Sequence, residues 1–438
     1  MQTASKKIIN GWAMFDWANS VYNLVITATI FPTYYETIAS ERTDPSGQSY
    51  VHFAGREFVN TSLYNYALGI ALLIVALALP LLTSIADYRG TKKKFMAFFL
   101  TMGSIACASM FLFKGLSTLW IGLTCVVLAC IGFWSSYVFS NSFLPEIAAP
   151  QDRDRISAKG FSYGYVGSVL LQLICLVFVL NSKWFADNTF AARLSFLLAG
   201  LWWLGFGFYS LSRMPAPMAA GNGSGTENIL AGGYKELGKV WGQIKRMPVI
   251  KRFLGAFFFY SMGVQTVMLA AALYGKSELG IETSNLIITI LLIQLVAIPG
   301  AFLISKLSSK IGNFPALMVV IVFWVLICIA AYLIPKGNVM LFYILGACVG
   351  FVMGGIQSLS RSTYSKLMPE TKDTASFFSF YDVTEKIAVV IGMFSFGFIT
   401  ELTGSQRNSV LALMGFFLLG LIWLIYTNNT QKKQLRVV

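Results

Sequence analysis

Long apolar runs recur along almost the whole chain, and they limit its possible folds more than any other feature. A helix needs about 20 mostly apolar residues to cross a bilayer, and short polar segments separate runs of this length. Because lipid offers no hydrogen-bond partners, a spanning segment has to satisfy its backbone internally, as a helix does. We therefore predict an all-α polytopic membrane protein with twelve transmembrane helices, at residues 12–38, 62–85, 95–113, 118–142, 158–180, 190–210, 250–274, 284–305, 314–334, 339–361, 376–400 and 408–427.

The basic residues are distributed unequally between the two sides of the predicted helices. With the amino terminus in the cytoplasm, the cytoplasmic segments would hold 24 of the 33 Lys and Arg residues. Lys and Arg accumulate in the cytoplasmic loops of membrane proteins, so we expect both termini in the cytoplasm. The net charge of +14 does not indicate a nucleic-acid partner, because the cations sort by membrane side and form no single soluble face. The short loops favour a bacterial inner membrane, where we expect a monomer in the lipid bilayer.

The longest internal polar stretch, residues 211–252, separates six predicted helices from six. Its middle is rich in Pro, Gly and Ala, which is typical of a flexible linker. The segment 234-YKELGKVWGQIKR-246 follows, with apolar residues at helical spacing and lysines between them. It predicts an amphipathic helix on the cytoplasmic membrane surface, with a solvated connector as the alternative. We expect three parts: a six-helix bundle at 1–210, the linker at 211–249 and a second bundle at 250–438.

Two basic loops occupy equivalent places in the two predicted halves. The loop 86-ADYRGTKKK-94 follows the second helix, and 305-SKLSSKIGN-313 follows the eighth. A repeat at about half the chain length indicates duplication of a six-helix unit. Many secondary transporters share this arrangement and bind their solute between the repeats, near the bilayer midplane.

Polar side chains form one stripe along the first predicted helix. Asp16, Asn19, Ser20, Asn23 and Thr27 recur at helical spacing. Inside a membrane, polar groups are tolerated where they face other helices or a water-filled cavity. We predict that Asp16, Asn19 and Asn23 belong to a solute or coupling cavity. The alternative is that Asp16, close to the predicted helix start, is an interfacial cap or packing group.

The helix predicted at 376–400 carries three charged residues, Asp382, Glu385 and Lys386. A charge that faces lipid costs about 2.5–3.5 kcal/mol on insertion scales, so we expect these side chains to be internal. Their spacing of three and four residues allows one cluster, whose remaining negative charge suits a proton or the ammonium group of a solute. A purely structural ion cluster is the alternative. Gln265, a neutral hydrogen-bonding residue on another helix, is expected in the same cavity wall.

Two gating candidates, Gln357 and Arg361, lie at the end of the helix predicted at 339–361. They continue the face of three glycines at four-residue spacing, a pattern that favours close helix packing, with a hinge as the alternative. Arg361 can latch onto an acid such as Glu146, or it can simply belong to the cytoplasmic excess of positive charge.

The plan of six plus six helices with a basic loop after the second helix resembles the major facilitator superfamily. The loop keeps Asp87 and Gly90 of the superfamily pattern, but has Thr83 and Tyr88 where a Gly and an Arg are expected. The resemblance implies a cytoplasmic gate in which Asp87 binds the amino terminus of the eleventh helix, where a carboxylate meets the positive end of a helix dipole. The expected gating residues of this loop are Asp87, Arg89, Gly90 and Lys92.

Three stretches resemble a particular branch of that superfamily, the autophagy-related vacuole effluxers. They are 12-WAMFDWANSVY-22, 141-NSFLPEIAAPQDRDRISAKG-160 and 354-GGIQSLSRSTYSKLMP-369. The branch is known in fungi for amino-acid export from the vacuole. This sequence departs from it at Met262, where many members have an acid, and at Glu385, where they have Gly. Charge is therefore placed on a different helix than in its relatives.

The resemblance implies a secondary active transporter that moves a small solute, expected to be an amino acid, as an exporter that works by alternating access. Protons are the hypothetical coupling ion. The alternative function is a membrane receptor or scaffold that has the fold but does not transport. No catalytic or nucleotide-binding motif is present, and the six cysteines have no metal-ligand spacing. We therefore expect no enzyme activity, no metal and no cofactor.

Overall fold

The computed structural model describes residues 2–44, 49–185, 187–216 and 229–437, and nearly all of them lie in helices. The α-helices are α1 (Lys6–Val21), α2 (Phe31–Ile38), α3 (Asn60–Arg89), α4 (Lys92–Ser109), α5 (Leu119–Ser142), α6 (Leu144–Ile147), α7 (Arg153–Leu180), α8 (Phe190–Arg213), α9 (Ile229–Arg246), α10 (Pro248–Leu273), α11 (Thr283–Ile311), α12 (Asn313–Leu333), α13 (Val339–Leu367), α14 (Thr374–Thr403) and α15 (Gln406–Val437). Two π-helical segments are η1 (Tyr22–Ile30) and η6 (Tyr274–Glu278), and the 3₁₀ turns are η2 (Met110–Leu112), η3 (Leu116–Thr118), η4 (Pro150–Asp152) and η5 (Ser182–Trp184).

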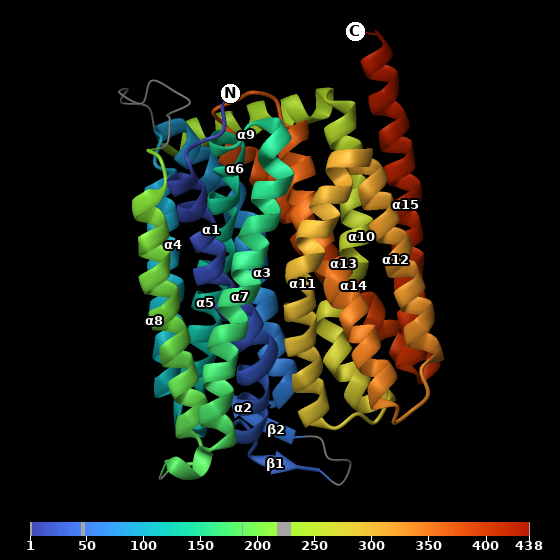
Figure 1. The fold of residues 1–438 in the computed structure, drawn as a ribbon. Coiled ribbons are helices and arrows are strands. Elements are labelled where there is room, and N and C mark those ends of the chain that lie inside the picture. Colours follow the sequence, from blue (N-terminus) through green and yellow to red (C-terminus); the bar gives the residue numbers. More distant parts are fainter. Residues whose placement is uncertain (1, 45–48, 186, 217–228, 438) are drawn as a thin grey trace.

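Within the described residues, eleven helical segments are long and apolar enough to cross a membrane. The segment predicted as the first helix is not among these eleven, but α1, η1 and α2 follow one another without a break from Lys6 to Ile38. Figure 1 places α1 near one end of the bundle and α2 near the other. The predicted all-α, polytopic fold is therefore confirmed.

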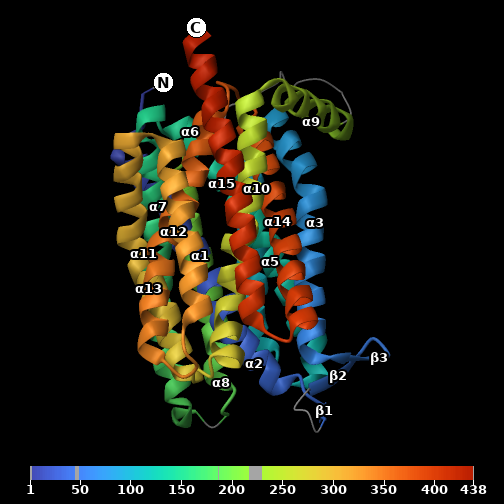
Figure 2. The same cartoon turned by 90° about the vertical axis from the view of Figure 1, so that its right-hand side faces the viewer.

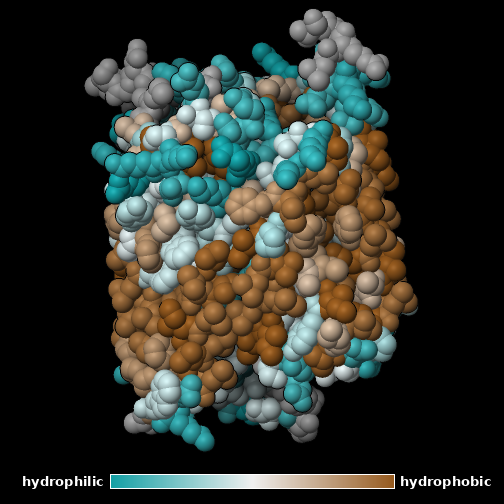
Figure 3. All heavy atoms as spheres, in the orientation of Figure 1, coloured by the Kyte–Doolittle hydropathy of each residue, from teal (hydrophilic) through white to brown (hydrophobic). Residues whose placement is uncertain are grey.

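Both chain termini lie at the same end of the bundle (Figures 1 and 2). We call this end the terminal end and the opposite one the far end. Figure 3 shows a broad hydrophobic band between two hydrophilic ends, as a protein in contact with lipid requires. That the terminal end faces the cytoplasm remains a prediction from the distribution of basic residues.

A small antiparallel sheet at the far end was not predicted. It contains β1 (Arg42–Thr43), β2 (Ser49–Phe53) and β3 (Arg56–Val59) in that order. The turn between β2 and β3 consists of Ala54 and Gly55, which both have positive φ, as a two-residue hairpin of type I′ requires.

The helices pack into two groups, which meet mainly through four pairs of helices. We call α1–α8 the first half and α10–α15 the second half. Across the boundary, α3 and α5 pack against α14, and α7 packs against α11 and α13. The glycines predicted for close packing lie where α13 packs on α11, and a larger residue would clash there. A Cβ atom on Gly350 would lie only 2.4 Å from the carbonyl oxygen of Ile293, and a Cβ atom on Gly354 only 2.3 Å from the carbonyl oxygen of Ala297.

Helix α9 lies outside the bundle at the terminal end (Figure 2). The predicted amphipathic helix is present, whereas most of the predicted flexible linker, residues 217–228, lies outside the described residues. Val240 and Ile244 are buried, and α9 packs mainly on α3. It also reaches the second half, because Lys239 binds Asp373 at 3.0 Å and the ring of Trp241 stacks on that of Phe380. Helix α9 therefore packs against both halves of the protein, in addition to its expected place at the membrane surface.

Candidate functional site

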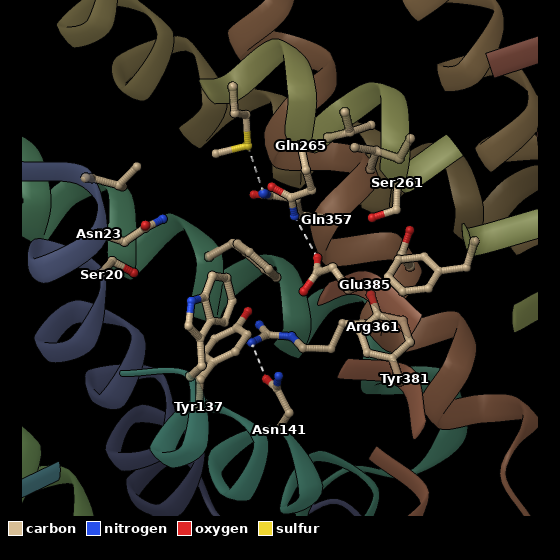
Figure 4. A pocket seen from close by; sticks show the side chains of 18 of the residues that line it. Ser20, Asn23, Tyr137, Asn141, Ser261, Gln265, Gln357, Arg361, Tyr381 and Glu385 are labelled. Carbon is tan, nitrogen blue, oxygen red and sulfur yellow. Dashed lines mark hydrogen bonds between the residues drawn. The ribbon is translucent and has the colours of Figure 1, made fainter. Parts of the chain in front are cut away.

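A pocket lies between the two halves (Figure 4). The space among its lining atoms, including the part that is open to solvent, is about 880 Å³. The lining comes from α1, η1, α5 and α7 of the first half and from α10, α13 and α14 of the second. The lining residues are Ser20, Asn23, Leu24, Phe133, Trp134, Tyr137, Asn141, Phe161, Tyr165, Phe257, Tyr260, Ser261, Val264, Gln265, Met268, Ile356, Gln357, Ser360, Arg361, Tyr381 and Glu385.

Aromatic side chains form much of the pocket wall. The rings of Phe257 and Tyr381 stack with their centroids 4.1 Å apart, which fixes the wall of the second half. The hydroxyl of Tyr165 donates to Gln357 Oε1 at 2.8 Å, so the two halves also touch within the pocket. Asn23 lies in η1, and π-helical turns are frequent at functional sites.

Glu385 is one of two charged residues in the lining, and its side chain is 13% exposed. Figure 4 shows its carboxylate facing Gln265, whose Nε2 donates to Glu385 Oε1 at 2.7 Å. Behind it, the buried Lys386 Nζ lies 2.9 Å from Asp382 Oδ1 and 3.1 Å from Glu385 Oε2. The predicted cluster is therefore present, with two acids and one base. Lys386 Nζ also lies 3.2 Å from the ring centroid of Trp134, which links α14 to the first half.

Arg361 is the other charged residue in the lining, but its guanidinium is buried and already bonded. Its Nη1 donates to Asp16 Oδ2 at 3.1 Å and to Asn141 Oδ1 at 3.0 Å. Its Nε and Nη2 donate to the side chain and the carbonyl of Ser157, both at 2.9 Å. One residue of α13 thus holds α1, α5 and α7 of the first half.

Arg361 thus binds an acid of the other half, as one of the two alternatives predicted, although the acid is not Glu146. The partner of Arg361 is Asp16, and Glu146 instead binds Lys92. Both partners lie deeper than expected, because α1 begins at Lys6 and α13 continues to Leu367. Asp16 is ten residues from the start of α1, about 15 Å along its axis at 1.5 Å per residue, so it is no interfacial cap. Its buried side chain, paired with Arg361, fits the other alternative, a packing group.

A second group of contacts between the halves involves Asp87 at the end of α3. Its carboxylate accepts hydrogen bonds from the backbone N–H groups of Ala375 and Ser376, at 3.3 and 2.7 Å, and from the hydroxyl of Ser376 at 2.7 Å. The predicted contact with the start of the eleventh membrane helix, α14, is thus present. The carboxylate lies at the positive end of that helix dipole.

The other predicted gating residues of this loop have different surroundings. Lys92 is fully buried, binds Glu146, and donates to Thr374 Oγ1 at 2.8 Å. Gly90 ends α3 with a φ of 65°, which glycine adopts without strain. Arg89, in contrast to the prediction, is exposed at the surface and does not join this group of contacts.

The equivalent loop of the second half makes a matching set of contacts with α7. Asp154, near the start of α7, accepts from Ser308 Oγ at 2.8 Å, Asn313 Nδ2 at 2.9 Å and Lys366 Nζ at 2.6 Å. An acid near a helix start therefore links the halves in both places. Together with the Arg361 contacts, these bonds join the two halves on the side of the terminal end.

The family model described as "Vacuole effluxer Atg22 like" matches residues 4–436. The chain belongs to this Atg22-like family. YxiO, an uncharacterized MFS-type transporter of Bacillus subtilis (strain 168), is 31% identical to this Atg22-like chain over 422 residues, which cover 95% of the chain and 94% of YxiO. Autophagy-related protein 22 of Eremothecium gossypii is 26% identical, over 93% of the chain and 88% of that protein.

Solved structures share the fold of the Atg22-like chain over nearly its whole length. The proton:xylose symporter XylE has a TM-score of 0.71 at 14% identity, over 96% of this chain and 95% of XylE. The transporter FucP in its outward conformation has a TM-score of 0.69 at 13% identity, over 96% of this chain and 98% of FucP. The solved structures thus show the fold, while the family model and the likeness to YxiO make the Atg22-like chain a transporter of the major facilitator superfamily and not an enzyme.

The pocket wall of the Atg22-like chain differs in part from the predicted cavity. Asn23, Gln265 and Glu385 line it as expected, as does Gln357, which was predicted only to gate. The lining does not include Asp16, Asn19, Asp382 or Lys386, because these side chains lie behind it, in contact with other helices. Asn19, for example, accepts from Ser136 at 3.4 Å.

The aromatic wall and the Asp154 contacts were not predicted from the sequence. Trp134, Tyr137 and Asn141 recur at a spacing of three and four residues, which marks one helix face. Aromatic rings at that spacing are equally typical of lipid-facing or core positions, so the pattern alone did not separate them from packing. The repeat that pairs 86–94 with 305–313 indicates that the second loop also contacts the other half, but 305–313 contains no acid, so it does not point to Asp154 on α7.

Proposed function

We propose that this transporter moves amino acids, or closely similar small solutes with an amino group, and that the pocket is their binding site. The observation that carries the proposal is the partly exposed carboxylate of Glu385. The cluster of Asp382, Glu385 and Lys386 has one negative charge in excess when all three are ionised, so an ammonium group would balance it. The aromatic rings around the pocket also attract cations.

The rest of the pocket suits the remainder of such a solute. Arg361 already binds Asp16, Asn141 and Ser157, so it is a poor partner for a solute carboxylate. The side-chain amides of Asn23 and Gln357, in contrast, carry donors in the lining. They are the groups that would receive the carboxylate of an amino acid.

We further propose that transport proceeds by alternating access, with residues 1–210 and 250–438 moving as two units joined by 211–249. The contacts of Asp87, Asp154 and Arg361 would then hold the terminal end closed and break when it opens. Gly90 and Lys92 would shape this gate. Such a change needs only a shift between two conformations that differ by a few kcal/mol.

The carboxylate of Glu385 and the expected orientation in the membrane favour export of the solute in exchange for protons. A proton and an ammonium group would compete for the carboxylate of Glu385, so binding of one would promote release of the other. With the terminal end in the cytoplasm of a bacterial cell, the exchange would expel solute as protons enter. The description of the family as vacuole effluxers supports the same direction.

Binding of paired solutes to the purified protein tests the pocket assignment. We expect amino acids to bind about tenfold to a hundredfold more tightly than their N-acetyl derivatives, since a hydrogen bond to a charged group contributes about 1.5–3 kcal/mol. Trp134 lies in the lining, so the titration can follow tryptophan fluorescence. Glu385→Gln should abolish the preference, and Glu401→Gln, an exposed site on the same helix, should preserve it. Equal binding of the two forms by the unaltered protein would refute the proposal.

A further inference from the structure

A second hollow lies at the terminal end, between the start of α10 and the last turns of α15, away from the solute pocket. Its lining is rich in cations and contains no acid: Arg252, Tyr426, Asn429, Thr430, Lys432 and Lys433. The two neutral side chains Asn429 and Thr430 add hydrogen-bonding groups. This combination is typical of a site for a phosphate-bearing anion.

The positive charge of the hollow is not balanced within the described part of the chain, where none of its three cations forms an ion pair. Arg252 contacts Thr430, and its guanidinium lies 4.1 Å from the ring centroid of Tyr426. The first turn of α10 has no acidic residue. Lys432 and Lys433 near the end of a helix interact favourably with its dipole, but Arg252 near the start of α10 does not. An anion would therefore relieve an unfavourable arrangement.

The level of the hollow along α15 points to a lipid as the source of that anion. Ile422, Trp423 and Tyr426 are 63%, 42% and 54% exposed, which continues the lipid-facing surface up to Tyr426. Beyond it the sequence becomes polar, as 427-TNNTQKK-433, and α15 extends past the other helices at this end (Figures 1 and 2). Trp and Tyr at such a boundary mark the headgroup level of a membrane.

We propose that this hollow binds the phosphate of an anionic phospholipid, with the acyl chains along the exposed apolar face of α15. Basic pockets at the cytoplasmic membrane surface bind anionic headgroups in this way. A free phosphate ion would use the same cations but would gain nothing from the apolar face below them. The site is independent of the solute and of the direction of transport.

The test is a competition between phosphatidylglycerol and phosphatidylcholine for the purified protein, with the bound lipids counted by native mass spectrometry. The combined variant Arg252→Gln, Lys432→Gln and Lys433→Gln should lower the preference for phosphatidylglycerol at least about tenfold, because each cation near an anionic surface contributes to binding. Arg252→Lys, which keeps the charge, should retain most of that preference.

A charge-matched control separates this site from the general positive charge of the terminal end. Lys7, Lys306 and Lys310 are exposed there, and their combined replacement by glutamine should leave the lipid preference unchanged. Equal losses in the two combined variants would overturn the proposal, as would no loss in the first. Displacement of phosphatidylglycerol by millimolar inorganic phosphate would assign the site to the free ion instead. A melting curve for each variant establishes that it is folded.

Discussion

Replacing Arg361 with glutamine should lower the free energy of unfolding by about 3–5 kcal/mol, the usual effect of removing one partner of a buried ion pair. The guanidinium is 1% exposed and neutralises Asp16, which is 3% exposed. Without it, the carboxyl group of Asp16 would be left buried between α1 and α7 without its ionic partner. The loss should appear as a lower melting temperature and denaturation midpoint in detergent.

The double variant Asp16→Asn and Arg361→Gln identifies the cause. Removing both charges eliminates the unpaired one, so most of the lost stability should return. If the double variant were as unstable as Arg361→Gln alone, the loss would have to come from the bonds to Asn141 and Ser157, and the pair with Asp16 would not be the main contribution.

Replacing Asp87 with asparagine should shift the protein toward a conformation that is open at the terminal end. The substitution keeps the size of the side chain but removes the charge that accepts three hydrogen bonds from Ala375 and Ser376. A charge-assisted bond contributes about 1.5–3 kcal/mol, so the ratio of closed to open protein should fall about tenfold to a hundredfold. Stability against unfolding should change less than in Arg361→Gln.

The shift can be measured as a distance between spin labels at the terminal end. Lys94 in the first half and Lys372 in the second are exposed, and Cys348 is the exposed cysteine to remove first, since the other five are buried. Asp87→Asn should populate a longer distance between labels at Lys94 and Lys372. Glu370→Gln, which removes a nearby exposed acid, should not. An unchanged distance distribution in Asp87→Asn would mean that this contact does not hold the end closed.

The sequence was most informative where a rule acts within a single helix. Apolar length located the spans, and the spacing of Asp382, Glu385 and Lys386 placed three charges in one cluster. The contact between Asp87 and α14 was also predicted, but only because the family resemblance supplied it. No local pattern connects Asp16 with Arg361, which are 345 residues apart in the chain.

The missed features depend on which side chains the fold brings together. At the terminal end, α1 and α13 continue beyond their apolar runs, because the polar residues there are buried against the other half. Hydropathy ends a helix where the apolar run ends, so it placed Asp16 and Arg361 too near the surface. The sheet at the far end had a readable local signal: 49-SYVHFAGREFV-59 has two runs rich in aromatic and β-branched residues around Ala-Gly, a pattern typical of a hairpin.

The central claim, that the pocket carries amino acids across the membrane through Glu385, is tested most directly by counterflow. Proteoliposomes loaded with unlabelled amino acids would be mixed with each labelled amino acid in turn, for the unaltered protein, Glu385→Gln and Glu401→Gln. We expect particular amino acids to enter the vesicles. Glu385→Gln should reduce their entry at least about tenfold, by the loss of a charge-assisted bond, whereas Glu401→Gln should leave it intact. No counterflow of any amino acid through folded protein would contradict the central claim, and would leave another solute, or a receptor or scaffold that does not transport.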